Sequence, residues 1–299
     1  TVLSTDGTIT LTADLRTKLL GTAKSGDATI VVKVTDGSKS YTYKLKITFV
    51  TKYIATAADL AAMEAMGADS SSSNYLTGLY VLTADIDYAN AGFCINYFGG
   101  TFEGQGHTIS NIKVKDAMGG GLFVNVNANG VIRNVAFVNL VNDLPITGGW
   151  IRRNLLAFVF QGTIENVYVS GSRKNIEGNN CGVIGQPGNS DKNHPATIKN
   201  LVVILDDSAA TNANGKTGIG SALGGANGYV VCENVIGISS RYPWYANDGY
   251  WAGVDGAVKT TNCVGYTSVS EASGATYSAT DWNATIWDIS GDIPVFVEK

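Results

Sequence analysis

The sequence is poor in charge, proline and histidine. Of its 299 residues 15% are charged, 5 are proline and 2 are histidine, and the formal net charge is −4. A slightly acidic chain with few cations argues against nucleic acid or an anionic membrane as a partner. The two histidines, His107 and His194, give no support to a histidine base, a metal cluster or a nucleophilic triad. We therefore expect no cofactor and no nucleic acid partner.

Long apolar runs are also missing. No stretch approaches the roughly 18 residues that a membrane-spanning helix needs, so the chain is not expected to be embedded in a membrane. No signal peptide is present, and the sequence looks like a mature or excised fragment. Low charge with abundant Asn, Thr, Ser and Gly fits exported proteins. We therefore expect a secreted or cell-surface location.

The few cysteines lack the spacing of a metal or redox site. Cys94, Cys181, Cys232 and Cys263 are far apart, and none forms a Cys-x-x-Cys pair. An even number in an exported chain allows disulfides, but small buried apolar residues are the favoured interpretation. The sequence therefore predicts four free thiols.

The sequence does contain a repeat, apolar-x-Asn-apolar-x-apolar, with weaker copies toward its end. Residues at −2 and +1 around the asparagine would lie on opposite faces of a regular strand. A bend at Asn, which tolerates the left-handed αL region, brings both inside. One Asn per coil, stacked about 4.8 Å apart, lets the side-chain amides hydrogen-bond. The repeat predicts a right-handed parallel β-helix with an asparagine ladder at Asn111, Asn134, Asn166, Asn200, Asn234 and Asn262.

Both ends of this β-helix are expected to be capped. Residues 56–65 predict a short helix, with Thr56 and Asp59 resembling a capping box. That helix would cover the open edge and the apolar end of the first coil. At the other end, an apolar cluster is expected to close the last coil, made of Trp282, Ile286, Trp287, Ile293, Pro294 and Phe296.

Residues 1–51 are predicted to form a separate unit in front of the β-helix, which spans residues 52–299. Alternating strands are expected over 8–13, 28–34 and 41–50, with a turn at Asp36-Gly37 between the last two. This is too short for a complete seven-strand sandwich of about 100 residues. We expect a small antiparallel, Ig-like segment, either complete or truncated.

Three stretches resemble the GLUG-repeat surface proteins of bacteria: Tyr80–Asp87, Phe98–Ile112 and Gly121–Phe123. The resemblance extends over roughly residues 53–299, and the first 51 residues are similar to Ig-like or cadherin-like modules. It implies a repetitive β-helix surface protein of a kind often implicated in adhesion or found beside peptidase domains. Here the later coils carry long insertions and lose the short GLUG spacing. The family supplies no catalytic motif to transfer.

Four carboxylates are candidates for catalysis or for calcium binding. Parallel β-helices also host polysaccharide-cleaving enzymes with acidic residues on adjacent coils, and Asp206-Asp207 superficially matches such a pair. Asp85 and Asp87, with Asn90, could supply oxygen ligands to calcium. All four aspartates follow strand-like segments, where Asp is a common turn residue. The turn interpretation is favoured for both pairs.

Long insertions interrupt the later coils, over 141–156, 171–181, 186–195, 206–220 and 239–256. Most follow the Asn-containing strand at one phase of the coil and should emerge along one side. Aromatic faces with amide and carboxylate groups suit sugar rings. The alternative is that these rings pack the loops onto the β-helix wall. The candidate ligand-binding residues are Trp150, Arg152, Tyr242, Trp244, Tyr245, Asp248, Tyr250 and Trp251.

The favoured hypothesis is a non-enzymatic binding or adhesion module that recognises carbohydrate or a host surface protein through these loops. It would act as a monomeric module of a longer surface protein. The first alternative is a polysaccharide-degrading hydrolase or lyase, or an inactive remnant of one. The second is a passive spacer. Carboxylates converging in a groove roughly 5–10 Å apart would favour the enzyme.

Overall fold

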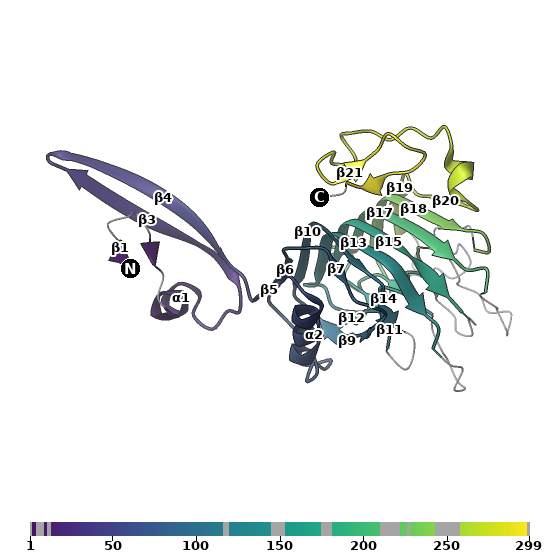
Figure 1. Ribbon diagram of the computed structural model, residues 1–299, viewed down its shortest axis with the longest axis horizontal. Helices are drawn as coiled ribbons and strands as arrows, with labels where there is room; N and C mark the ends of the chain where they lie inside the picture. The colour runs from purple at the N-terminus through teal and green to yellow at the C-terminus, as the bar shows by residue number, and fades with distance from the viewer. Residues whose placement is uncertain are drawn as a thin grey trace.

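The structure is a computed structural model, and its core is a stack of parallel β coils (Figure 1). This confirms the parallel β-helix with a short antiparallel segment in front of it. Within the described residues, no helix has both the length and the apolar character that crossing a membrane requires. The described ranges are 2–3, 9–10, 13–115, 120–144, 153–174, 181–209, 222–225, 228–242 and 258–297.

Two parallel sheets form the walls of the β-helix. The first has the order β19-β18-β17-β15-β13-β10-β6-β5 and the second β16-β14-β12-β9. The first consists of β5 (Lys52–Ile54), β6 (Leu79–Leu82), β10 (Thr101–Ser110), β13 (Val131–Asn142), β15 (Thr163–Arg173), β17 (Ala196–Asp206), β18 (Val230–Ser239) and β19 (Val258–Thr261). The second consists of β9 (Ile95–Phe98), β12 (Phe123–Val126), β14 (Ala157–Phe160) and β16 (Ile184–Pro187). Short strands continue the first sheet past its bends: β7 (Ile86–Asp87), β8 (Gly92–Phe93), β11 (Lys113–Val114) and β20 (Val264–Tyr266).

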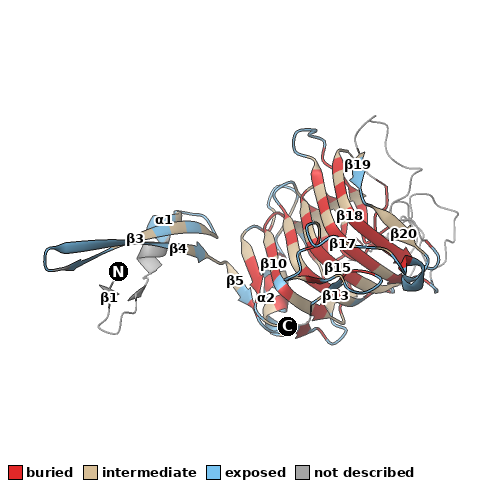
Figure 2. Ribbon diagram, turned by 90° about the horizontal axis from the view of Figure 1, so that it is seen from above, coloured by how far each residue is buried: buried red, intermediate tan, exposed pale blue. Residues whose placement is uncertain are grey.

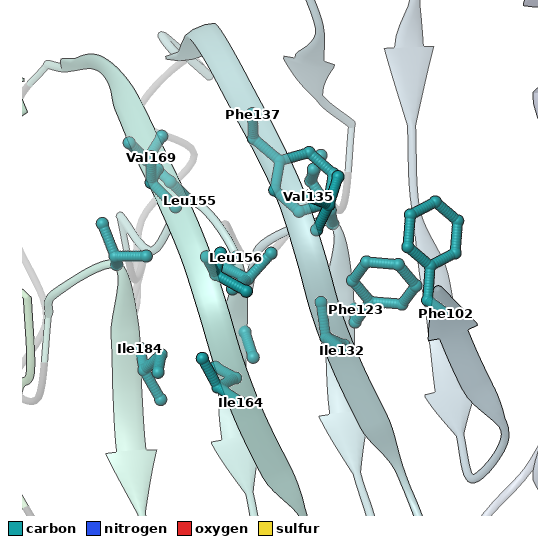
Figure 3. Packing of buried hydrophobic residues seen from close by; sticks show 14 of the residues in the cluster. Phe102, Phe123, Ile132, Val135, Phe137, Leu155, Leu156, Ile164, Val169 and Ile184 are labelled. Carbon is teal, nitrogen blue, oxygen red and sulfur yellow. The ribbon is translucent and has the colours of Figure 1, made fainter. Parts of the chain in front are cut away.

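The core fills the space between these sheets. In β13 the residues at −2, +1 and +3 from the asparagine are Ile132, Val135 and Phe137, and all three are buried. The equivalent residues of β15 and β17 are buried as well. Figure 3 shows the inward side chains meeting between the walls, with Phe102 next to Phe123 at a centroid distance of 5.7 Å. The bend at Asn therefore turns both flanking apolar positions inward, as the repeat predicts.

An asparagine ladder runs along one corner of the β-helix. All six predicted asparagines have φ between 52° and 57°, in the left-handed region. Along the ladder each Nδ2 donates to the Oδ1 of the preceding asparagine, at 3.1, 2.9, 2.9 and 3.0 Å from the last rung backward. The ladder is confirmed for five of the six residues, which are Asn134, Asn166, Asn200, Asn234 and Asn262.

Asn111 lies on a different corner, so its predicted place in this ladder is wrong. The register aligns Phe102 with Ile132 and Ile109 with Phe137. In the place of a preceding asparagine, Glu103 Oε1 accepts from Asn134 Nδ2 at 2.9 Å. Asn111 instead accepts from Asn139 at 3.2 Å and donates to Asp87 at 2.9 Å. Both corners need an αL residue between inward apolar positions, so the motif alone does not distinguish them.

Charged side chains of alternating sign form a second row beside the ladder. The last paired residues before the bend follow one another across successive coils in the order Glu103, Arg133, Glu165, Lys199 and Glu233. Arg133 Nε lies 2.6 Å from Glu103 Oε2, and Lys199 Nζ lies 3.2 Å from Glu233 Oε1. Such partly exposed pairs contribute little each, on the order of 0–1 kcal/mol. We call these five residues the charge row.

The helix α2 (Ala57–Met66) covers the first coil, as predicted. Thr56 is the N-cap, as expected, because the Asp59 N–H donates to Thr56 Oγ1 at 3.2 Å. The Asp59 carboxylate accepts from Thr56 Oγ1 at 2.8 Å and from the Ala55 N–H at 3.3 Å, which is a variant of the capping box. Leu60 and Met63 are buried in the main core. These contacts seal the amino-terminal end of the stack.

The predicted carboxy-terminal apolar cluster forms, but the prediction that it closes the last coil is wrong. It comprises the 3₁₀-helix η1 (Val269–Ala272), β21 (Trp287–Asp288), β22 (Val295–Phe296) and the intervening segments. Residues 275–297, here called the strap, pack on the outer side of β17 and β18, where Trp282 and Trp287 form a cluster with Val202, Ile236 and Ile238 (Figure 1). These strands are apolar on both faces, so their outer face needs a cover as well.

In the amino-terminal segment a hairpin projects away from the β-helix (Figure 2). The strands β3 (Gly26–Asp36) and β4 (Lys39–Phe49) are joined by a two-residue loop in which Gly37 has φ 58°. One face carries the pairs Ile30–Leu45, Val32–Tyr43 and Val34–Tyr41, and the Tyr43 side chain is 55% exposed. The expected strand over 8–13 is wrong in part: β1 (Val2–Leu3) pairs with β2 (Ile9–Thr10), and α1 (Ala13–Leu20) then begins.

All four cysteines lie in the described ranges, and none of them forms a disulfide. Cys232 is buried in the core and Cys263 packs against it, as their inward register predicts. Denatured, unreduced protein is expected to titrate four thiols. In the native protein Cys181 and Cys232 should react more slowly than Cys94 and Cys263, because both are buried and the reagent is excluded. Burial also raises the pKa of the Cys232 thiol. A titration that finds no thiols would mean two disulfides and a wrong coil register.

Candidate functional site

Four insertions leave the β-helix from one edge. The register pairs Asn142 with Arg173, Ser172 with Asp206, and Leu205 with Ser239. The ends of β13, β15, β17 and β18 therefore lie side by side, and the insertions that follow them start from a common line. The insertion 186–195 instead follows β16 of the second sheet. The common origin is thus confirmed for the other four.

A buried ion pair occupies the base of these loops. Arg173 Nε donates to Asp207 Oδ1 at 2.9 Å and its Nη2 to Oδ2 at 2.5 Å, and both side chains are fully buried. Ser239 Oγ donates to Asp207 Oδ2 at 2.9 Å. Burial alone would lower the pKa of Arg173, but the Asp207 carboxylate outweighs it and raises the pKa. Three successive coils are therefore tied together where their loops begin.

A second group of buried contacts joins the end of one loop to the start of the next. Arg153 is fully buried and donates to the backbone carbonyls of Lys174 and Leu144, at 2.8 and 2.6 Å. Asn142 Nδ2 donates to the Asn154 carbonyl at 2.8 Å. The segment that returns at 153–154 is thereby held against both neighbouring loop bases. We call these two groups of contacts the loop-base network.

The sequence analysis missed the loop-base network, although the repeat contains a signal for it. Arg173 and Asp207 each lie seven residues after a ladder asparagine, Asn166 and Asn200. They therefore occupy the same position in adjacent coils and carry opposite charges. A search for complementary residues at equal distances from the repeat asparagines would have paired them.

The structure gives Asp206 and Asp207 separate surroundings. Asp206 is exposed and accepts from the Ser208 N–H at 3.0 Å, and its contacts with Ser208 lower the pKa of its carboxyl. A general acid in glycoside hydrolysis instead needs a raised pKa. Asp207 is occupied by Arg173 and Ser239. Both aspartates thus have structural partners at the base of the loop.

Asp85 and Asp87 are hydrogen-bonded at the corners of the first coils. Asp85 Oδ1 accepts from the Thr108 N–H at 2.8 Å and lies 3.1 Å from His107 Nδ1. Asp87 accepts from Asn111 Nδ2 and from the Ala89 N–H, and these contacts lower its pKa. No group of three or more His, Cys, Asp or Glu side chains suited to a metal occurs in the described ranges.

Among the predicted ligand-binding residues, Tyr242 is described and the others are not. Tyr242 is buried, its N–H donates to Ser239 Oγ at 3.1 Å, and its ring centroid lies 5.9 Å from Arg173 Cζ. This ring belongs to the loop-base network, which fits the packing interpretation for Tyr242. Outside the described residues lie Trp150, Arg152, Trp244, Tyr245, Asp248, Tyr250 and Trp251.

Comparison with known proteins finds similarity over part of the chain. No protein-family model matches the chain, and no solved structure matches it. Among curated proteins, the chain is similar to Halomucin from Haloquadratum walsbyi, with 32% identity over 175 residues. The similarity covers 52% of this chain and 2% of Halomucin.

Proposed function

We propose that this chain is a non-enzymatic binding module of a cell-surface protein, which recognises carbohydrate or a host surface protein through loops on one side of the β-helix. The observation that carries the proposal is the common edge from which four insertions start, fixed by the loop-base network. A rigid scaffold with variable loops along one line is suited to recognition. The module is proposed to act as a monomer within a longer exported protein.

Similarity to other proteins supports a surface location. The chain matches a small part of Halomucin, a name that suggests a mucin-like surface protein. The first coils also resemble GLUG-type repeats, and residues 1–51 resemble Ig-like spacer modules. A repeated β-helix with an amino-terminal spacer is the arrangement that such a surface module needs. The enzymatic alternative is weaker, because Arg173 and Ser239 already engage Asp207.

Replacing Trp244 or Trp251 with alanine tests the loops as the binding site. We expect each variant to weaken ligand binding about tenfold or more, since a lost stacking ring costs about 1–3 kcal/mol. The melting temperature should not change. A glycan array and a panel of host surface proteins give the binding readout, and thermal melts report the fold.

Trp287→Ala is the matched control, because Trp287 is 1% exposed and should lower the melting temperature strongly. If Trp244→Ala and Trp251→Ala destabilise the protein as Trp287→Ala does, their rings are packing residues and this side is not the site. Polysaccharide cleavage that is abolished by Asp206→Asn would establish the enzymatic alternative.

A further inference from the structure

The strap does not contact the asparagine ladder evenly. Trp287 Nε1 donates to Asn166 Oδ1 at 3.1 Å, and Asn200 Nδ2 donates to the Asp281 carbonyl at 2.9 Å. Beside the last two rungs, Asn234 and Asn262, the strap and the outer face of β18 and β20 enclose a hollow of about 330 Å³. The strap therefore sits directly on the middle rungs and leaves a space at the last ones.

Aromatic rings form part of the wall of this hollow. Tyr266 contributes from β20, and Tyr277 and Trp282 contribute from the strap. The Tyr277 hydroxyl donates to the Asp292 carbonyl at 3.0 Å, and its ring meets Trp282 edge to face at 6.2 Å. Burial, followed by the proximity of Tyr266 and Asp292, raises the pKa of Tyr277 to about 12, so its hydroxyl stays protonated. The Tyr277 ring is thus held in place by Asp292 and Trp282.

Oxygen acceptors and a phenol line the rest of the hollow. Asn262 is the last rung: its Nδ2 donates to Asn234, while no donor to its Oδ1 is found among the described residues. Asp281 and Tyr266 line the same space, and neither the Asp281 carboxylate nor the Tyr266 hydroxyl has a hydrogen-bond partner in the described part of the chain. The described lining holds one carboxylate and no cationic side chain.

We propose that this hollow, the strap groove, is a binding site for a neutral sugar residue. The partly exposed rings of Tyr266 and Tyr277 offer apolar faces to sugar C–H groups, while Trp282 is buried and supports the Tyr277 ring. The acceptors of the hollow suit several sugar hydroxyls. A single carboxylate without a cation disfavours acidic sugars. The inference rests on the proposed surface-binding function, but it assigns carbohydrate as the ligand and places it between the strap and β20 instead of within the loops.

Calorimetric titration of the complete 299-residue chain tests the strap groove. The probes are glucose, galactose, mannose and N-acetylglucosamine, each with its short oligomers, and oligomers of a uronic acid. Tyr266→Ala and Asp281→Asn should each weaken binding of the neutral probe about tenfold or more, which corresponds to 1.4 kcal/mol or more. Asp281→Asn keeps the backbone carbonyl that Asn200 uses. Asp288→Asn is the matched control, because Asp288 is exposed on the same strap, does not line the groove and should bind as wild type does.

The outcomes separate the groove from the loops. Unchanged affinity in both groove variants overturns the inference, and loss of sugar binding in Trp244→Ala alone would return the site to the loops. A chain that binds no neutral sugar, or prefers the uronic acid, also overturns it, whereas capture of a host protein would still support the proposed function. If Tyr266→Ala lowers the melting temperature, Tyr266→Phe removes only the hydroxyl and still predicts weaker binding.

Discussion

Asp207→Ala is expected to lower the free energy of unfolding by about 3–5 kcal/mol, because it leaves the fully buried Arg173 guanidinium without its carboxylate. The substitution also removes the acceptor of Ser239 Oγ. For a β-helix of this size the loss should lower the melting temperature by roughly 10 °C. Chemical denaturation gives the free energy and a thermal melt gives the temperature.

The neighbouring Asp206→Ala is the matched control for this experiment. Its carboxylate is exposed and accepts a single local hydrogen bond from Ser208, so a loss of about 1 kcal/mol or less is expected. Replacing both partners, Arg173→Met with Asp207→Leu, should recover much of the stability, because an apolar pair leaves no buried charge. Equal losses for Asp206→Ala and Asp207→Ala would show that the ion pair does not hold the loop bases.

Asn166→Leu should cost on the order of 1–3 kcal/mol of unfolding free energy. Asn166 donates to Asn134 Oδ1, and its own Oδ1 accepts from Asn200 Nδ2 and Trp287 Nε1. Leucine removes all three bonds and adds strain at a φ of 52°. The midpoint of urea unfolding measures the change.

Asn262→Leu separates the contribution of the amide hydrogen bonds from that of backbone strain. It carries the same strain at φ 53° but loses a single ladder bond, to Asn234. A smaller loss at this last rung than at Asn166 is expected if the amide bonds matter. Identical losses would assign the effect to backbone strain, and an unchanged midpoint for Asn166→Leu would refute the ladder at that coil.

The β-helix and its ladder were predictable because they depend on local geometry. A residue that accepts αL between inward apolar positions is needed once per coil, so the sequence repeats it. The same locality explains the error at Asn111: the corner to which an asparagine belongs depends on how the coils align. Gln105 and Gly106 make the bend that aligns with Asn134, and they do not match the motif.

The strap and the groove beside it were less predictable than the loop-base network, because their contacts join residues that no repeat relates. Trp287 bonds to Asn166 across 121 positions, and no repeat relates the two residues. The apolar cluster around Trp287 was correctly identified, but an apolar segment can cover an end or an outer face equally well. Only the outward apolar residues of β17 and β18, such as Val202 and Ile236, indicate which surface needs the cover.

The charge row has a consequence for how the coils assemble. Successive coils present similar apolar residues to the core. A strand could therefore skip its native neighbour and pair with the strand of the following coil at little cost in core packing. If β13 were skipped, Glu103 would face Glu165, and if β15 were skipped, Arg133 would face Lys199. Like charges opposite each other are destabilising. The alternation of charge therefore disfavours misfolded states in which one coil is left out of the stack.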